Sequence, residues 1–215
     1  MTLARMSLAM RRTLAALAMA MAAALYGGEA AAVPAGPQDS VRSFYDVLLA
    51  TMKNGPSLGQ SGRYAALAPV VGNVFDVPLM ARLAVGPSWD NLSPAQQQQI
   101  AVAFGRYVSA TYADRFDRYS GQQLQITGDE PYGGGVIVET KIVQAGEDPV
   151  TINYMMRRHD GVWQISDVYL DGTISQLATQ RSEFHSILMR YGVAGLISTL
   201  DHKVDLLTTT SARSP

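Results

Sequence analysis

Apolar residues in the first half of the chain recur every three or four positions, which is the spacing of an amphipathic helix. The pattern predicts helices over about 39–53, 64–71 and 76–85, each with one apolar face. The first of these is expected to begin at Asp39, because aspartate is a good helix cap, and to stop at the Asn-Gly-Pro sequence of 54–56. The first part of the chain is therefore expected to be helical.

The strongest helix signal in the chain covers 93–119. This segment opens on Ser-Pro-Ala-Gln, which combines a serine cap, a proline in the first turn and a capping-box glutamine. Apolar side chains then continue at helical spacing as far as Phe116. We expect one long helix that ends near residue 119, before the glycine at 121.

From about residue 124 the apolar residues alternate with polar ones, which is the period of a β-strand. Turn sequences rich in glycine separate four such segments, at 133–135, 146–149 and 160–161. Antiparallel strands can be joined by connections as short as these. The pattern therefore predicts a four-stranded antiparallel meander.

Helical spacing returns after the last strand. Thr173 and Gln176 form a second capping box, so we expect two helices over 173–190 and 192–207, divided by Gly192. Helices, then a meander, then helices predict an α+β fold in which helices cover one face of the sheet.

The N-terminal segment has the layout of a secretory signal peptide. Three arginines precede an uncharged apolar run at 13–25, and small residues that fit an Ala-x-Ala cleavage site follow it. The run is shorter than the roughly 20 apolar residues that a bilayer span needs. We therefore expect residues 1–32 to be cleaved on export, leaving one domain over 33–207 and a flexible tail at 208–215.

Composition excludes several kinds of site. The chain has 16% charged residues and a formal net charge of -1, so it lacks the basic surface of a nucleic-acid-binding protein. It contains no cysteine, which rules out disulfides, thiol nucleophiles and iron–sulfur clusters. Its three histidines match no metal-binding spacing, and no nucleophile elbow or phosphate-binding glycine loop is present. We expect neither a metal ion nor a cofactor.

One carboxylate, Asp167, stands out. Strict alternation places it on the same strand face as Trp163 and Ile165, toward the core. A buried carboxylate needs a partner, which Arg181 or the backbone amides at the start of the next helix could supply. It could instead act as a general base in a hydrophobic cone, as in small isomerases. We favour the structural role, because no second catalytic group accompanies it.

Aromatic and methionine side chains converge on the predicted helix and strand faces that point inward. Such stripes usually form an ordinary packed core. Spacing alone does not distinguish a packed core from a lined cavity, so both interpretations stay open at this point.

Landmarks between about 75 and 203 occur in an order that resembles a known family. They are Phe75-Asp76, Met80-Ala81, Gly86, Trp89, Ser93-Pro94, Gln96, Tyr112, Tyr119-Ser120-Gly121, Tyr154, 160–165, Asp167-Val168, Asp171-Gly172, Ser175, Arg181, Phe184, Gly192, Leu196-Ile197 and Leu200. This series resembles the MlaC, or toluene-tolerance auxiliary, family of periplasmic lipid-binding proteins. The segment 171–179 is closer to the HpnM branch, which is associated with hopanoids, than to the EGVS-type segment of phospholipid carriers.

The resemblance implies a deep apolar pocket between a sheet and helices, and no catalytic residues. It also implies a Gram-negative periplasmic carrier of hopanoid or phospholipid between the inner and outer membranes. Its expected partners are an inner-membrane transporter of ABC or RND type and an outer-membrane lipoprotein complex. The residues expected to line the pocket are Met80, Leu83, Tyr107, Tyr112, Phe116, Val136, Val138, Ile152, Tyr154, Met156, Trp163, Ile165 and Phe184.

Three hypotheses follow from the sequence. The first is a non-enzymatic lipid carrier in the periplasm. A sixteen-carbon tail costs on the order of 12 kcal/mol to bring into water, so such a carrier needs an apolar cavity. The second is a cone-shaped α+β isomerase or hydrolase that uses Asp167 as its base. The third is a periplasmic interaction module with a solid core.

Overall fold

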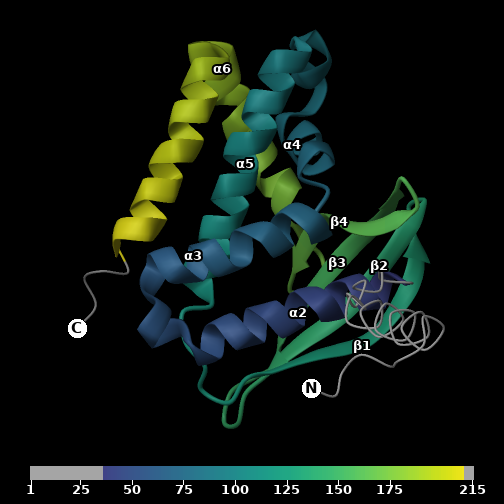
Figure 1. The fold of residues 1–215 in the computed structure, drawn as a ribbon. Coiled ribbons are helices and arrows are strands. Elements are labelled where there is room, and N and C mark those ends of the chain that lie inside the picture. Colours follow the sequence, from purple (N-terminus) through teal and green to yellow (C-terminus); the bar gives the residue numbers. More distant parts are fainter. Residues whose placement is uncertain (1–35, 211–215) are drawn as a thin grey trace, which may run out of the picture. The chain divides into compact units, whose positions relative to one another are not determined.

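The computed structural model describes residues 36–210 (Figure 1). The predicted signal peptide, 1–32, lies outside the described residues, and so does 211–215. The elements in chain order are α2 (Pro37–Lys53), α3 (Gly55–Val74), α4 (Val77–Val85), the 3-10 helix η2 (Gly86–Asn91), α5 (Pro94–Arg115), β1 (Gln123–Tyr132), β2 (Gly135–Val143), β3 (Val150–His159), β4 (Val162–Leu170), β5 (Ile174–Ser175) and α6 (Gln176–Thr210). This order confirms the predicted α+β class.

The sheet is antiparallel throughout, and its strand order β1-β2-β3-β4-β5 follows the chain. The first four strands are the predicted meander, but the sheet has five strands instead of four. Asp171 and Gly172 adopt positive φ angles of 50° and 75°, which turn the chain back so that β5 pairs with the end of β4. The expected helix start at Thr173 was therefore wrong: α6 begins at Gln176, where the Ser175 hydroxyl accepts a hydrogen bond from a first-turn amide.

A β-bulge at Ser166 interrupts the alternation of β4. Met155 of β3 pairs with Asp167 and Met156 pairs with Ile165, so Ser166 is an extra residue in β4. The faces to which side chains point are therefore exchanged on the two sides of Ser166. Ile165 and Val168 consequently both belong to the hydrophobic core, although they are three positions apart. Asp167 is buried, as expected, but the bulge means that the expected shared face with Ile165 was wrong.

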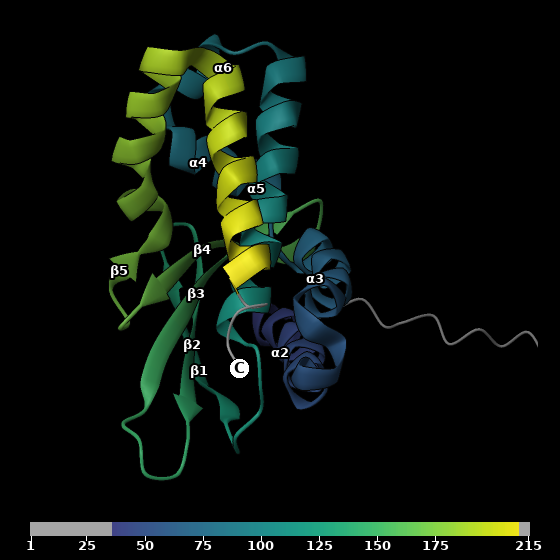
Figure 2. The same cartoon turned by 90° about the vertical axis from the view of Figure 1, so that its left-hand side faces the viewer.

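The helix α2 lies across one face of the sheet (Figures 1 and 2). Its side chains Val41, Phe44 and Leu48 are fully buried at helical spacing. The helix begins at Pro37, two residues earlier than expected, and Asp39 caps it from within the first turn by accepting a hydrogen bond from the Gly36 amide at 3.2 Å.

The helix α3 is longer than predicted. It begins at Gly55 instead of 64. Pro56 does not prevent this, because it occupies the first turn, where a proline is tolerated. Its path is broken at Gly59, which has a φ of 60°. The predicted stop at 54–56 is thus a sharp boundary between two helices.

The helix α5 has the predicted capping box, in which the Ser93 amide donates to Gln96 Oε1 at 2.9 Å and the Gln96 amide donates to Ser93 Oγ at 3.3 Å. It ends at Arg115, four residues before the predicted end at 119. The buried guanidinium of Arg63 donates to the Ala113 carbonyl at 2.8 Å, and so satisfies one carbonyl of the final turn.

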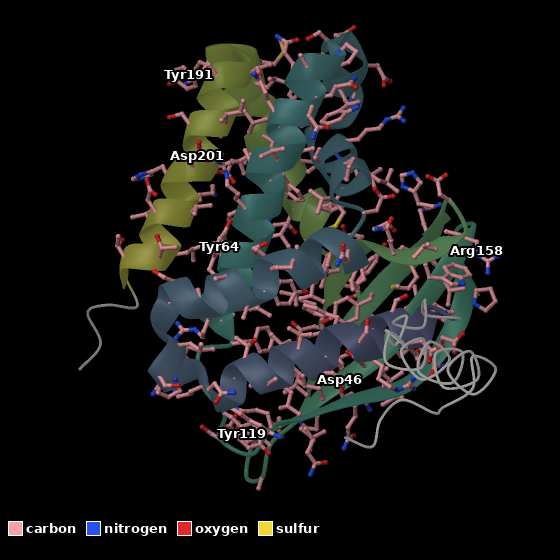
Figure 3. All side chains as sticks on the ribbon, viewed as in Figure 1. Asp46, Tyr64, Tyr119, Arg158, Tyr191 and Asp201 are labelled. Carbon is pink, nitrogen blue, oxygen red and sulfur yellow. The ribbon has the colours of Figure 1, made fainter. Side chains whose placement is uncertain are left out.

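The helix α6 consists of two helices joined at Gly192, as the sequence predicts. Gly192 has φ 66° and ψ -168°, a region that is essentially restricted to glycine. The second half packs beside α5 (Figure 2), where Arg106 and Asp201 form an ion pair at 2.6 Å. Figure 3 labels Asp201, and also Tyr191 next to the break. The helix continues to Thr210, three residues beyond the predicted domain end at 207.

Aromatic side chains from the helices and the sheet meet in the core beneath α2. The ring of Phe44 makes edge-to-face contacts with Phe75, Tyr112 and Tyr154, with centroid distances of 5.1, 5.0 and 6.4 Å. Such pairs contribute about 0.5–1.5 kcal/mol each beyond the burial of their area. This part of the molecule is a packed core.

Candidate functional site

A cavity of about 340 Å³ lies among α4, α5, the start of α6 and the ends of β2, β3 and β4. This volume falls in the range of small-molecule sites, about 300–1,000 Å³. Its lining residues are Phe75, Met80, Phe104, Tyr107, Val108, Thr111, Tyr112, Arg115, Phe116, Ile142, Val150, Ile152, Val168, Leu170, Asp171, Gln176, Leu177 and Gln180. Eleven of these 18 residues are apolar and two are tyrosines, so the cavity suits an apolar ligand.

A second depression, of about 980 Å³, runs between α5 and the second half of α6. Eight of its 12 lining residues are polar or charged, among them the paired Arg106 and Asp201. Ligand pockets are lined mainly by apolar side chains with a few well-placed polar groups. We therefore take the smaller cavity as the candidate site.

The helical wall of the cavity is one face of α5. Phe104, Val108 and Thr111 follow one another at three- and four-residue spacing, which places them on a common face. Tyr112 and Phe116 continue the wall toward the end of the helix, and their rings stack at a centroid distance of 5.7 Å. The spacing that forms the helix thus also forms the wall.

The sheet wall comes from the ends of three neighbouring strands. In the sheet register, Ile142 of β2 pairs with Val150 of β3, and Ile152 pairs with Leu170 of β4. All four side chains line the cavity, and so does Val168 on β4. Because side chains two apart on a strand share a face, the wall continues directly from the packed core.

A cluster of buried hydroxyls lies where the cavity meets the core. Burial raises the pKa of the hydroxyl of Tyr112, which lines the cavity, so this group stays neutral. Behind it, the hydroxyls of Tyr45 and Thr140 are joined by a hydrogen bond of 2.6 Å, and the Thr140 hydroxyl donates to the Ile152 carbonyl. The inner end of the cavity is thus uncharged.

The charged residues of the lining are both exposed. Arg115 comes from the last turn of α5 and Asp171 from the turn after β4. Gln176 and Gln180, from the first turns of α6, are half-buried. The cavity therefore has an apolar interior and a polar rim, the arrangement that suits an amphipathic ligand.

Five of the thirteen residues predicted to line a pocket do line this cavity, namely Met80, Tyr107, Tyr112, Phe116 and Ile152. They come from α4, α5 and β3, three elements that are distant in the sequence. The structure therefore brings them together, while their part in ligand binding stays a prediction.

The other eight predicted residues do not line the cavity. Five are almost completely buried in the packed core, with at most 1% of their surface exposed: Val138, Tyr154, Met156, Ile165 and Phe184. Three are half-buried and pack against that core: Leu83, Val136 and Trp163. They face inward as predicted, but other side chains fill the space in front of them. The rings of Phe44 and Tyr45, for example, cover Tyr154.

Asp167 has the protein partners that its burial requires. Its Oδ2 accepts a hydrogen bond from the Ser175 hydroxyl at 2.6 Å, and its Oδ1 accepts bonds from the amides of Val168 at 2.7 Å and Leu177 at 3.4 Å. Burial raises the pKa of this carboxyl, and these hydrogen bonds oppose the rise. The carboxylate therefore ties β4 to the start of α6.

Arg181, the other expected partner of Asp167, binds elsewhere. Its Nε donates to the Leu83 carbonyl at 3.0 Å, at the end of α4, and its side chain is exposed. The guanidinium acts on Asp167 only as a nearby positive charge that lowers the carboxyl pKa. The sequence predicted either Arg181 or backbone amides at the helix start as the partner of Asp167. The structure has the backbone amide of Leu177 in contact with the carboxylate, together with the Ser175 hydroxyl.

Sequence analysis missed several lining residues. Phe104, Val108 and Thr111 lie on the helix face that the spacing had already identified, so the same pattern could have indicated them. The polar rim has no such signal. Its residues, Arg115 and Asp171 among them, come from separate elements and meet only in the folded chain.

Across residues 36–210, no helix combines the length and apolar character needed to cross a bilayer. Within the same range, no three His, Cys, Asp or Glu side chains gather as metal ligands would. The chemistry available at the candidate site is therefore that of apolar contact, hydrogen bonding and two rim charges.

Two comparisons with known proteins bear on the site. A family model described as MlaC protein matches residues 42–202 of the chain. A solved structure of a phospholipid-binding protein from Ralstonia solanacearum, in complex with a phospholipid, is similar with a TM-score of 0.67 and 26% sequence identity. That match covers 80% of this chain and 99% of the Ralstonia chain.

Proposed function

Because the chain belongs to the MlaC family, we propose that it is a lipid-binding protein that holds the apolar part of one lipid in the cavity between α5, α6 and the sheet. The observation that carries the proposal is the apolar lining of this cavity, with its charges confined to the rim. The phospholipid complex of the similar Ralstonia protein supports the same assignment.

The energetics of an acyl chain explain why such a cavity is needed. Each buried methylene group is worth roughly 0.8 kcal/mol, so a lipid tail does not leave a membrane for water unless another apolar surface receives it. The walls formed by Phe104, Val108 and Phe116 on one side and Ile152 and Val168 on the other provide that surface. The Tyr112 hydroxyl at the inner end is neutral, so a lipid tail that reaches it meets no charged group there.

The wider role that we propose is transport. The predicted N-terminal signal and the family together support a carrier in the periplasm of a Gram-negative bacterium, which moves phospholipid or hopanoid between the inner and outer membranes. An inner-membrane transporter of ABC or RND type and an outer-membrane lipoprotein complex are its proposed partners. The resemblance of 171–179 to the HpnM branch is the argument for hopanoid, and the Ralstonia complex is the argument for phospholipid.

A catalytic role for Asp167 has less support. The carboxylate does not line the cavity, and its two oxygens already accept three hydrogen bonds from the protein. A general base must lie within hydrogen-bond reach of the proton that it removes, and Asp167 does not border the space where a ligand would sit. A structural role explains the same contacts without a second catalytic group.

A transfer assay tests the carrier role. Donor vesicles that contain a labelled lipid and label-free acceptor vesicles are held apart, and the chain purified from the periplasm is added between them. Transfer in proportion to protein concentration supports a carrier, with phospholipid and hopanoid compared as cargo. A rate equal to that without protein, for both lipids, would rule out the carrier role.

A further inference from the structure

Two side chains of opposite charge, Arg115 and Asp171, lie at the rim of the same cavity without neutralising each other. No ion pair joins these two residues. Among residues 36–210, neither side chain has another ion-pair or hydrogen-bond partner. Within the described part of the chain, the rim therefore presents one unpaired positive and one unpaired negative group to whatever occupies the cavity.

A third polar side chain, that of Gln180, lies beside the same cavity. Gln180 contributes to the cavity lining, and its side-chain carbonyl oxygen is buried, with no hydrogen-bond partner among residues 36–210. Native proteins leave few buried polar atoms unpaired, because each costs roughly 1–3 kcal/mol. A ligand in the cavity would reach this acceptor only after the Gln180 side chain turns toward the cavity.

We infer that the rim recognises the head group of a zwitterionic phospholipid, with the Arg115 guanidinium on the phosphate and the Asp171 carboxylate on the amine. The planar guanidinium matches two phosphate oxygens, and a carboxylate is the natural partner of an ammonium. This inference rests on the proposed function and narrows it to a lipid class.

Charge arrangement separates this class from other lipids. An anionic phospholipid without an amine would satisfy Arg115 and place its negative charge near Asp171. A hopanoid hydrocarbon carries no phosphate and would leave both rim charges without a partner. Only a head group with both signs of charge pairs with both side chains.

The test is a competition between two lipids. The chain, purified from the periplasm and stripped of lipid, is incubated with vesicles of phosphatidylethanolamine and phosphatidylglycerol in equal amounts, and bound lipids are quantified by mass spectrometry. R115Q should lower the affinity for both lipids about two- to fivefold, which is the loss in affinity expected when one exposed ion pair is removed. D171N should lower phosphatidylethanolamine binding by a similar factor and raise phosphatidylglycerol binding, because it removes both an attraction and a repulsion.

Matched controls separate recognition from folding. D160N changes another exposed aspartate with a positive φ, 48°, and R190Q changes an exposed arginine of α6 outside the cavity. Both should leave the lipid ratio unchanged. Arg115 also lies in the last turn of α5, where a positive charge stabilises a helix, so the melting temperature of R115Q is measured alongside.

The outcomes are distinct. An unchanged lipid ratio in D171N, or a loss in R115Q that only follows lowered stability, overturns the head-group inference and leaves lipid binding intact. Displacement of bound lipid by excess inorganic phosphate would identify a simple anion site and overturn it as well. A wild-type chain that takes up neither lipid overturns both the inference and the proposed function.

Discussion

Replacing Val168 by tryptophan is expected to block lipid binding while the fold persists. Val168 lines the cavity from β4 and is 9% exposed, and the space of about 340 Å³ in front of it can accept an indole ring. If the indole displaces as few as two methylene groups of a bound tail, about 1.6 kcal/mol is lost, which lowers affinity at least about tenfold. The melting temperature should change by no more than about 2 °C, because the new ring fills empty space.

The matched control is Val138→Trp. In the sheet register, Val138 and Val168 flank Tyr154 on either side, but Val138 is 0% exposed in the packed core. Overpacking such a site costs about 1–3 kcal/mol, which corresponds to a fall of roughly 2–12 °C in a domain of this size. Lipid uptake from vesicles and thermal unfolding are measured for both variants. Equal destabilisation of the two variants, with lipid uptake unchanged in Val168→Trp, would refute the distinction between cavity and core.

Three further predictions concern the elements that frame the cavity. Asp167→Ala should lower the free energy of unfolding, measured in urea, by about 3 kcal/mol, because it leaves the donors of Ser175 and Leu177 without an acceptor. Asp167→Asn should lower it by less, and the reverse order would argue against these hydrogen bonds. Because burial raises the pKa of Asp167, the folded chain holds this proton more tightly than the unfolded chain. Wild-type stability should therefore fall relative to Asp167→Asn as pH rises from about 4 toward neutrality, whereas parallel pH profiles would contradict the assigned pKa direction. Gly192→Ala should lower the free energy of unfolding, measured by calorimetry, by about 1–3 kcal/mol, because Gly192 has a positive φ. Gly72→Ala on α3 should not lower it, and equal effects of the two substitutions would argue against the break in α6.

Local sequence patterns predicted the elements of this fold well. The capping box at Ser93, the meander and the break at Gly192 are each encoded by a few adjacent residues, and the structure contains all three. The errors arose where the determinant is distant or irregular. At the end of α5, the Ala113 carbonyl is bound by Arg63, which lies 50 residues away in the chain. The bulge at Ser166 reverses a period-two argument without any marker in the sequence.

The candidate site was predicted only in part, for a physical reason. Alternation shows which side chains of a strand face inward, but it does not show which element covers them. On β3, Tyr154 and Ile152 share a face, yet Tyr154 lies beneath the aromatic rings of α2 and Ile152 borders the cavity. The helix face of α5 was easier to predict, because Tyr112 and Phe116 are four positions apart, about one helical turn, and their rings therefore stack.

The most direct test of the account is the lipid content of the protein itself. The full chain is expressed in a Gram-negative host and purified from the periplasm without detergent, and its lipids are extracted and quantified against protein by mass spectrometry. The account predicts stoichiometric lipid in the wild type and much less in Val168→Trp at equal yield of folded protein. A wild-type chain that emerges free of lipid, and stays empty after incubation with phospholipid or hopanoid vesicles, would contradict it.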